Sequence, residues 1–305
     1  MKHFLFKIFI FAISVFLLDI RYVQTNYWKS ENNVNKFDDI PYNITLANVG
    51  TSHGLYGLKY DVVPEINAWN FALSSQPYFY DYAMLNKYID HFEKDAIVII
   101  PISYFQVTGQ VDCAKFRSRY YRLLAKNEME YWTLKEYIAY CKFPIISAKM
   151  NILKTVRDFS KEQMSPYYGR IKHLEGENLY KYCVEKHKGW VNLYKENAYC
   201  ENSIAISKII DFCYAHNLRP VLITAPITDV LNNIYATDET FFPTFYRFSS
   251  DLQKKYPDLQ YLDYSHNNDF SSNHELFADG DHLNNFGAEK FTKTLISDLK
   301  ANNIL

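Results

Sequence analysis

One segment constrains the fold more than any other: the nearly uninterrupted apolar run Ala96–Ile102. A strand with one face in water alternates apolar and polar residues, whereas a strand covered on both faces has no need to. The run therefore predicts a parallel strand at the centre of a sheet, with helices on both sides.

The segments around this run alternate between strand-like and helix-like patterns. Short apolar stretches predict strands at 44–49, 66–71, 220–225 and 259–263. Apolar residues at helical spacing predict helices at 78–92, 202–216, 241–255 and 286–302, the last capped by Asn284 or Asn285. This order predicts an α/β fold, a three-layer α/β/α sandwich with a mainly parallel, flavodoxin-like sheet over residues 44–305. Residues from about 104 to 200 break the rhythm and predict a mostly helical insertion.

The N-terminus has the pattern of a targeting segment. Lys2 and Lys7 precede a run of eleven apolar or small residues, 8–18, and no Ala-x-Ala-like cleavage site follows. A span of about 20 residues is reached only by tolerating Lys7, Asp19 and Arg21 near its ends. We expect a membrane anchor or uncleaved signal segment over residues 1–23 and a polar linker over 24–43. The basic start places the remaining chain outside the cytoplasm, in the periplasm or at the cell surface. The alternative is a buried helix of the domain.

Composition excludes several classes of function. The formal net charge is -1 and no basic run is present, so no nucleic-acid partner is expected. None of the five cysteines forms a C-x-x-C pair, which excludes zinc-ribbon and thioredoxin-like sites. We expect mostly free, buried thiols, no metal and no cofactor; a Cys183–Cys200 disulfide is the alternative.

The first predicted strand ends in Gly50-Thr51-Ser52-His53-Gly54, which places Ser52 at the sheet edge where ligands bind. A serine hydroxyl becomes a nucleophile only with a base in hydrogen-bond reach and a third group that orients the base. The C-terminal run Asp279-Gly280-Asp281-His282 supplies both, with Gly280 expected at the bend. Three alternatives remain. Ser52 could only cap a helix, Asp281 could replace Asp279, and a metal site could involve His266, His274, Asp279 and His282, although their spacing fits no standard ligand pattern.

These motifs together resemble the SGNH (GDSL-like) hydrolase superfamily. Gly-Thr-Ser-His follows the first strand, and Asp-x-x-His-Leu-Asn-x-x-Gly lies near the C-terminus. The resemblance covers about residues 44–104 and 202–300 and is closest to extracytoplasmic members that acylate or deacylate cell-envelope polymers, such as the D-alanyl-transfer and alginate O-acetylation proteins. It implies Ser52 as nucleophile, His282 as base and Asp279 as orienter.

The sequence departs from the superfamily at the oxyanion hole. The second block lacks its glycine, and Asn70 is the candidate donor there. The third block lacks its asparagine, and Ser103 or Gln106 is the candidate substitute. His53 and Asp281 are expected to point away from Ser52 and His282.

The motifs therefore predict a serine esterase or O-acyltransferase that acts on an acylated cell-envelope glycan. A transferase outside the cytoplasm would need a membrane partner to deliver its acyl group. The alternative is a non-catalytic SGNH-fold protein that binds glycan or assists assembly, which the missing asparagine and the aromatic middle segment favour.

Overall fold

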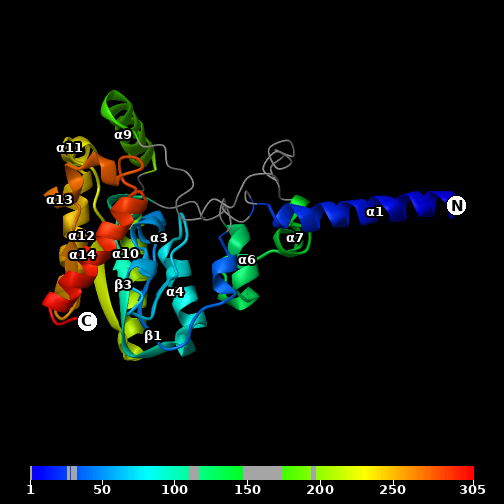
Figure 1. The fold of residues 1–305 in the computed structure, drawn as a ribbon, viewed down its shortest axis with the longest axis horizontal. Coiled ribbons are helices and arrows are strands. Elements are labelled where there is room, and N and C mark those ends of the chain that lie inside the picture. Colours follow the sequence, from blue (N-terminus) through cyan, green and yellow to red (C-terminus); the bar gives the residue numbers. More distant parts are fainter. Residues whose placement is uncertain (1, 26–27, 29–32, 110–116, 147–173, 194–196) are drawn as a thin grey trace. The chain divides into compact units, whose positions relative to one another are not determined.

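A computed structural model describes the chain except for residue 1 and residues 26–27, 29–32, 110–116, 147–173 and 194–196 (Figure 1). It divides into two compact units. The N-terminal unit comprises Met1–Asp39 and Ala114–Gly169, and the sheet unit comprises Ile40–Cys113 and Arg170–Leu305.

The described part of the sheet unit contains a five-stranded, all-parallel sheet in the order β2-β1-β3-β4-β5. The strands are β1 (Ile44–Asn48), β2 (Ala68–Asn70), β3 (Phe92–Pro101), β4 (Arg219–Thr224) and β5 (Gln260–Asp263). The predicted apolar run lies in β3, between β1 and β4, and its residues 96–102 are buried. The predicted α/β fold with a mainly parallel sheet is confirmed, and the strand order is the flavodoxin-like one.

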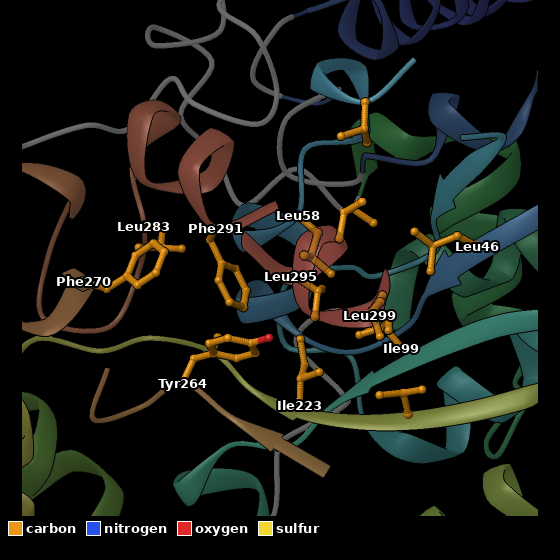
Figure 2. Close-up of a cluster of buried hydrophobic side chains, with 14 of the residues drawn as sticks. Leu46, Leu58, Ile99, Ile223, Tyr264, Phe270, Leu283, Phe291, Leu295 and Leu299 are labelled. Carbon is orange, nitrogen blue, oxygen red and sulfur yellow. The ribbon is translucent and has the colours of Figure 1, made fainter. Parts of the chain in front are cut away.

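Helices cover both faces of this sheet. Alternate strand residues face one side, where Ile99 and Ile223 pack with Phe291, Leu295 and Leu299 of the last helix (Figure 2). On the other side, α10 packs against β4 and α4. The helical elements of the unit are α3 (Ser52–Gly57), η2 (Tyr60–Val62), α4 (Tyr78–Lys87), η3 (Ile89–His91), α5 (Tyr104–Thr108), α9 (Gly176–Asn192), α10 (Ala198–Ala215), α11 (Asp229–Ala236), α12 (Phe241–Lys255), α13 (Asn268–Ser271), η10 (His274–Leu276) and α14 (Asn285–Ala301).

The strand order determines where a ligand can bind. The chain moves from β1 outward to β2, and then from β3 outward in the opposite direction to β4 and β5. Such a reversal opens a crevice at the carboxyl ends of the two strands where the direction changes, here β1 and β3. Ser52 follows β1 and Ser103 follows β3, so both serines lie at the carboxyl ends of these two strands.

The N-terminal unit contains the long apolar helix α1 (Lys2–Val23), whose 22 residues give a length of about 33 Å. It is long and apolar enough to cross a membrane, although a signal sequence has the same features. Only 6% of its most apolar window is buried, which disfavours the alternative of a core helix. The unit's other elements are η1 (Asn35–Phe37), η5 (Arg117–Arg119), α6 (Tyr120–Leu123), η6 (Lys126–Glu128), α7 (Leu134–Tyr137), the π-helical turn η7 (Ile138–Lys142) and η8 (Pro144–Ile146).

Some details differ from the sequence-based expectations. Strand β2 is three residues long because the chain on either side of it leaves the sheet, and helix α11 was not anticipated. Helix α14 begins at Asn285, and the Asn284 side chain caps it by accepting the Gly287 N–H at 3.0 Å. The four cysteines that the structure describes, Cys141, Cys183, Cys200 and Cys213, are free, which disfavours the Cys183–Cys200 disulfide; Cys113 lies outside the described residues.

Candidate functional site

A tight turn carries Ser52 from β1 into α3. Gly50 adopts φ +112°, a conformation that side chains with a Cβ rarely adopt. A Cβ at this position would also lie 3.2 Å from the ring of Pro101 in β3. The Gly50 N–H donates to Oδ1 of the buried Asp81 at 2.7 Å, which fixes the turn from the other side. The sequence Gly-Thr-Ser therefore folds so that Ser52 starts α3 at the sheet edge.

A closed loop at residues 277–283 carries the other predicted site residues. An isolated bridge joins Phe277 and Leu283, and the Ala278 N–H donates to the His282 carbonyl at 2.8 Å. Inside the loop, Asp279 Oδ1 accepts the N–H groups of Asp281 at 3.1 Å and His282 at 3.0 Å. The backbone thus fixes the Asp279 carboxylate and the His282 ring relative to one another.

Gly280 was expected to allow a sharp bend, but the structure shows a different reason for a glycine at this position. Its φ is not positive, so its conformation does not require glycine. A Cβ at Gly280 would lie 2.5 Å from Cys183 Sγ of α9. Gly280 therefore allows the close approach of helix α9 to the loop.

The structure brings the three predicted catalytic residues into one hydrogen-bonded series, here called the Ser52 chain. Ser52 Oγ lies 2.9 Å from His282 Nε2, and His282 Nδ1 lies 2.9 Å from Asp279 Oδ2. A carboxylate only accepts hydrogen bonds, so Nδ1 carries the hydrogen and Nε2 is left to accept the Ser52 proton. The side chains of His282 and Asp279 are each 21% exposed, so this series is partly in contact with solvent.

A second series of the same residue types lies beside the first, here called the Ser103 chain. Ser103 Oγ lies 2.8 Å from His53 Nδ1, and His53 Nε2 lies 3.2 Å from Asp281 Oδ2. His53 and Asp281 are 5% and 2% exposed at their side chains, and Ser103 is 1% exposed. The rings of His53 and His282 meet edge to face with centroids 5.5 Å apart. The expectation that His53 and Asp281 point away from the site is wrong for Asp281, because its Oδ1 also lies 3.2 Å from His282 Nδ1. His53 bonds to Ser103 and Asp281 rather than to Ser52, as expected of a residue that points away from the nucleophile.

Helix α9 adds two residues that sequence analysis missed. Lys186 Nζ donates to Asp281 Oδ1 and also to the Tyr182 hydroxyl, the latter at 3.2 Å. The Tyr182 hydroxyl donates to Asp279 Oδ2 at 3.0 Å. Both residues lie four apart on one face of a helix in the region without a family motif. That spacing was the available signal, and it does not by itself reveal which loop the two side chains contact.

Burial and charge set the protonation of these groups. Burial opposes protonation of His282, but the nearby Asp281 and Asp279 outweigh it and raise the pKa of His282. Burial dominates at His53 and lowers its pKa. Burial also works against the charged form of Asp281, yet Lys186, His282 and His53 hold the Asp281 pKa well below its usual range. The pKa of Lys186 is raised, because Asp281 and Asp279 outweigh its burial.

The expected oxyanion donors Asn70 and Ser103 are already occupied. The Asn70 amide nitrogen lies 2.9 Å from the Gly54 carbonyl and 3.1 Å from the Leu58 carbonyl, so its two hydrogens hold α3 in place. This bonding contradicts an oxyanion role for Asn70. Neutral His53 donates to Asp281 through Nε2 and must accept the Ser103 hydrogen at Nδ1. The buried amide of Gln106, the other third-block candidate, has no hydrogen-bond partner among the described residues.

The charges and hydrogen bonds of these residues do not favour a metal ion. Among the described residues, His53, Asp281 and His282 come together as a possible ligand set, with ligand atoms within 4.8 Å of one another, rather than the set weighed from the sequence. Lys186 already supplies a positive charge to the Asp281 carboxylate. Both histidines direct a hydrogen toward aspartate rather than a lone pair toward a shared point. We therefore do not assign these residues as metal ligands.

Comparisons with known proteins give similarities of fold. No family model and no curated protein matches the chain. A Bacteroides fragilis protein provisionally named an acylhydrolase is 9% identical, with coverage of 90% of this chain and 96% of that chain and a TM-score of 0.45. A Streptococcus pneumonia protein provisionally named a platelet activating factor is 11% identical (94% and 99% covered, TM-score 0.43). A GDSL-like lipase from Bacteroides thetaiotaomicron is 10% identical (90% and 99% covered, TM-score 0.42).

Proposed function

We propose that this chain is a serine acyl-ester hydrolase or acyltransferase of the SGNH type, with Ser52 as nucleophile, His282 as base and Asp279 as orienter. The observation that carries the proposal is the partly exposed Ser52 chain, with its two hydrogen bonds of 2.9 Å at the carboxyl edge of a parallel sheet. The geometry meets the requirement that an activated serine has a base in reach and the base has a fixed tautomer.

The reaction proceeds through an acyl-serine. Ser52 Oγ bonds to the ester carbonyl carbon while its proton passes to His282 Nε2, and the C–O bond to the alcohol then breaks as His282 returns that proton to the leaving oxygen. A second hydroxyl, from water or a sugar, then bonds to the acyl carbon as its proton passes to His282 Nε2, and the C–O bond to Ser52 breaks as His282 returns that proton to Ser52 Oγ. Asp279 stabilises the imidazolium at both stages. The Ser52 backbone N–H, which the family resemblance implies, and the uncommitted Gln106 amide are the proposed oxyanion donors.

We further propose where the enzyme works and on what. The apolar α1 helix supports a membrane-anchored protein with its catalytic residues outside the cytoplasm. An acylated cell-envelope glycan is the proposed substrate, on the sequence resemblance, and a membrane protein is the proposed acyl donor if the acceptor is a sugar. Activity on acetylated and unacetylated glycans, with and without membranes, distinguishes an esterase from a transferase.

The decisive experiment is covalent labelling with a serine-reactive fluorophosphonate, followed by peptide mass spectrometry. We expect one label, on Ser52, that Ser52→Ala and His282→Ala both abolish. The double variant should retain the same residual turnover as either single variant, because the two groups act as a unit. A folded protein that takes no label and hydrolyses no ester would refute catalysis and favour a glycan-binding protein with the same fold.

A further inference from the structure

His282 lies beside two carboxylates rather than one. Its Nδ1 is 2.9 Å from Asp279 Oδ2 and 3.2 Å from Asp281 Oδ1. Each anion within a few ångströms favours the imidazolium form. Two uncompensated anions would both favour the imidazolium, and less of the His282 base would then be free to accept the Ser52 proton.

Lys186 contacts the second carboxylate directly. Its Nζ bonds to Asp281 Oδ1, the oxygen that also faces His282. The side chains of Lys186 and Asp281 are 14% and 2% exposed, so solvent screens the pair weakly. We propose that Lys186 of α9 is a positioning residue that neutralises Asp281, so that His282 faces the single uncompensated charge of Asp279 and releases its proton more readily than it would between two anions. This inference rests on the proposed function and extends it to a residue outside the family motifs.

The position of α9 is fixed independently of this ion pair. Cys183 is buried against Gly280 of the loop, and Leu179 is buried on the same helix. Trp190 stacks on Phe105 with ring centroids 4.3 Å apart and planes 11° apart. Lys186 is therefore carried on a helix whose packing does not depend on its charge, so its substitution tests charge more than placement.

Every element around His282 contributes to its charge environment. The groups that face it or its carboxylates are Asp279 and Asp281 from its own loop, Ser52, His53 and Tyr56 from α3, Tyr182, Cys183 and Lys186 from α9, and Tyr235 from α11, which burial keeps neutral by raising its pKa. His53 is neutral because burial lowers its pKa, and burial and nearby carboxylates raise the pKa values of Tyr182 and Cys183. Among these described groups, Lys186 is thus the permanent cation that offsets the two aspartates.

The test removes the charges of Lys186 and Asp281 singly and together. Each variant is assayed for the pH dependence of kcat/KM on a small chromogenic acetate ester. Lys186→Met should raise the midpoint of the acidic limb by about one pH unit, with a loss of about tenfold below the midpoint and recovery on the alkaline plateau. Lys186→Arg should keep the wild-type profile. Asp281→Asn should lower the midpoint, and the double variant Asp281→Asn with Lys186→Met should return it to the wild-type value. Lys181→Met, on an exposed face of the same helix where Lys181 pairs with Glu177 at 2.7 Å, is the matched control and should change nothing.

A second measurement tests the inference without requiring the protein to turn over a substrate. NMR titration of the His282 ring in 15N-histidine-labelled protein, assigned with His282→Gln, should show the same shifts without substrate. A folded Lys186→Met protein with unchanged His282 titration overturns the inference even if the enzyme is active. If that variant does not fold, the double variant decides, and a His282 midpoint about one unit away from wild type overturns the inference. An inactive wild type would instead refute the proposed function, while the titration still tests Lys186.

Discussion

The Ser52 chain and the Ser103 chain contain the same three residue types in the same order, and they differ in exposure. In the first, the side chains of His282 and Asp279 are each 21% exposed, whereas in the second the corresponding values for His53 and Asp281 are 5% and 2%. A nucleophile must reach its substrate, so only the first arrangement suits acyl transfer. The comparison teaches that a hydrogen-bonded Ser–His–Asp series does not define a catalytic site unless a substrate has access to its serine.

The largest expected contrast is between the two serines. Ser52→Ala should reduce ester turnover by at least about 10⁴-fold, because the acyl-serine cannot form. Ser103→Ala should cost less than about tenfold, since it removes one buried hydrogen bond to His53. Steady-state hydrolysis of the same chromogenic ester measures both. Equal losses in two folded variants would mean that the Ser103 chain takes part in the chemistry.

Substitution of Asp279 should mainly reduce activity, whereas substitution of Asp281 should mainly reduce stability. Asp279→Asn should lower turnover by about 10²- to 10⁴-fold with the fold retained, because it disturbs the tautomer of His282. Asp281→Asn should lower the free energy of unfolding by about 3 kcal/mol, because it leaves the Lys186 ammonium without its carboxylate in a largely buried position. Urea unfolding and turnover, measured on both proteins, give the four values. The distinction between the chains fails if Asp279→Asn proves the more destabilising of the two.

The two histidines should give opposite pH dependences of stability. The pKa of His53 is lowered on folding, so its contribution to stability is lost as pH falls below about 6.5. The pKa of His282 is raised, so its contribution is present below about 6.5 and is lost as pH rises through the folded value. Urea unfolding between pH 5 and 8 should therefore show stability falling toward acid in His282→Gln and rising toward acid in His53→Gln. Titration of one group changes the free energy of unfolding by at most about 1.4 kcal/mol per pH unit. Slopes of the same sign in the two variants would contradict the opposite pKa shifts of His53 and His282.

The smallest expected effect concerns the contact of α9 with the Ser52 chain. Tyr182→Phe removes the hydroxyl that donates to Asp279 Oδ2 and leaves the ring in place. Loss of one such bond should lower turnover by about two- to tenfold. Tyr180→Phe, an exposed tyrosine on the same helix, is the control. A loss as large as that of Asp279→Asn would assign Tyr182 a direct part in catalysis.

Much of this arrangement could be predicted from local sequence. The run at 96–102 identifies the central strand, and Ser52, Asp279 and His282 lie in motifs whose spacing reflects a turn and a closed loop. The Ser103 chain could not be predicted, because it depends on how α3 is rotated about its axis, and successive helical residues point about 100° apart. Lys186 lies in a segment without a motif, and its contact with Asp281 arises only from the packing of α9. Asn70 was misassigned because the sequence shows a polar residue at the end of β2 but not the carbonyls of Gly54, Leu55 and Leu58 around its amide.

The Ser52 chain and the Ser103 chain are joined by two pairs of residues that are adjacent in the sequence. Ser52 and His53 are neighbours in α3, and Asp281 and His282 are neighbours in the loop, so each pair of adjacent residues sends one side chain into each series. A substitution at Ser52 or His53 removes a hydrogen bond from one series, whereas Asp281 contacts the histidines of both. The insertion or deletion of a single residue in either segment would shift the register of both at once. A change in chain length should therefore be selected against within these two segments.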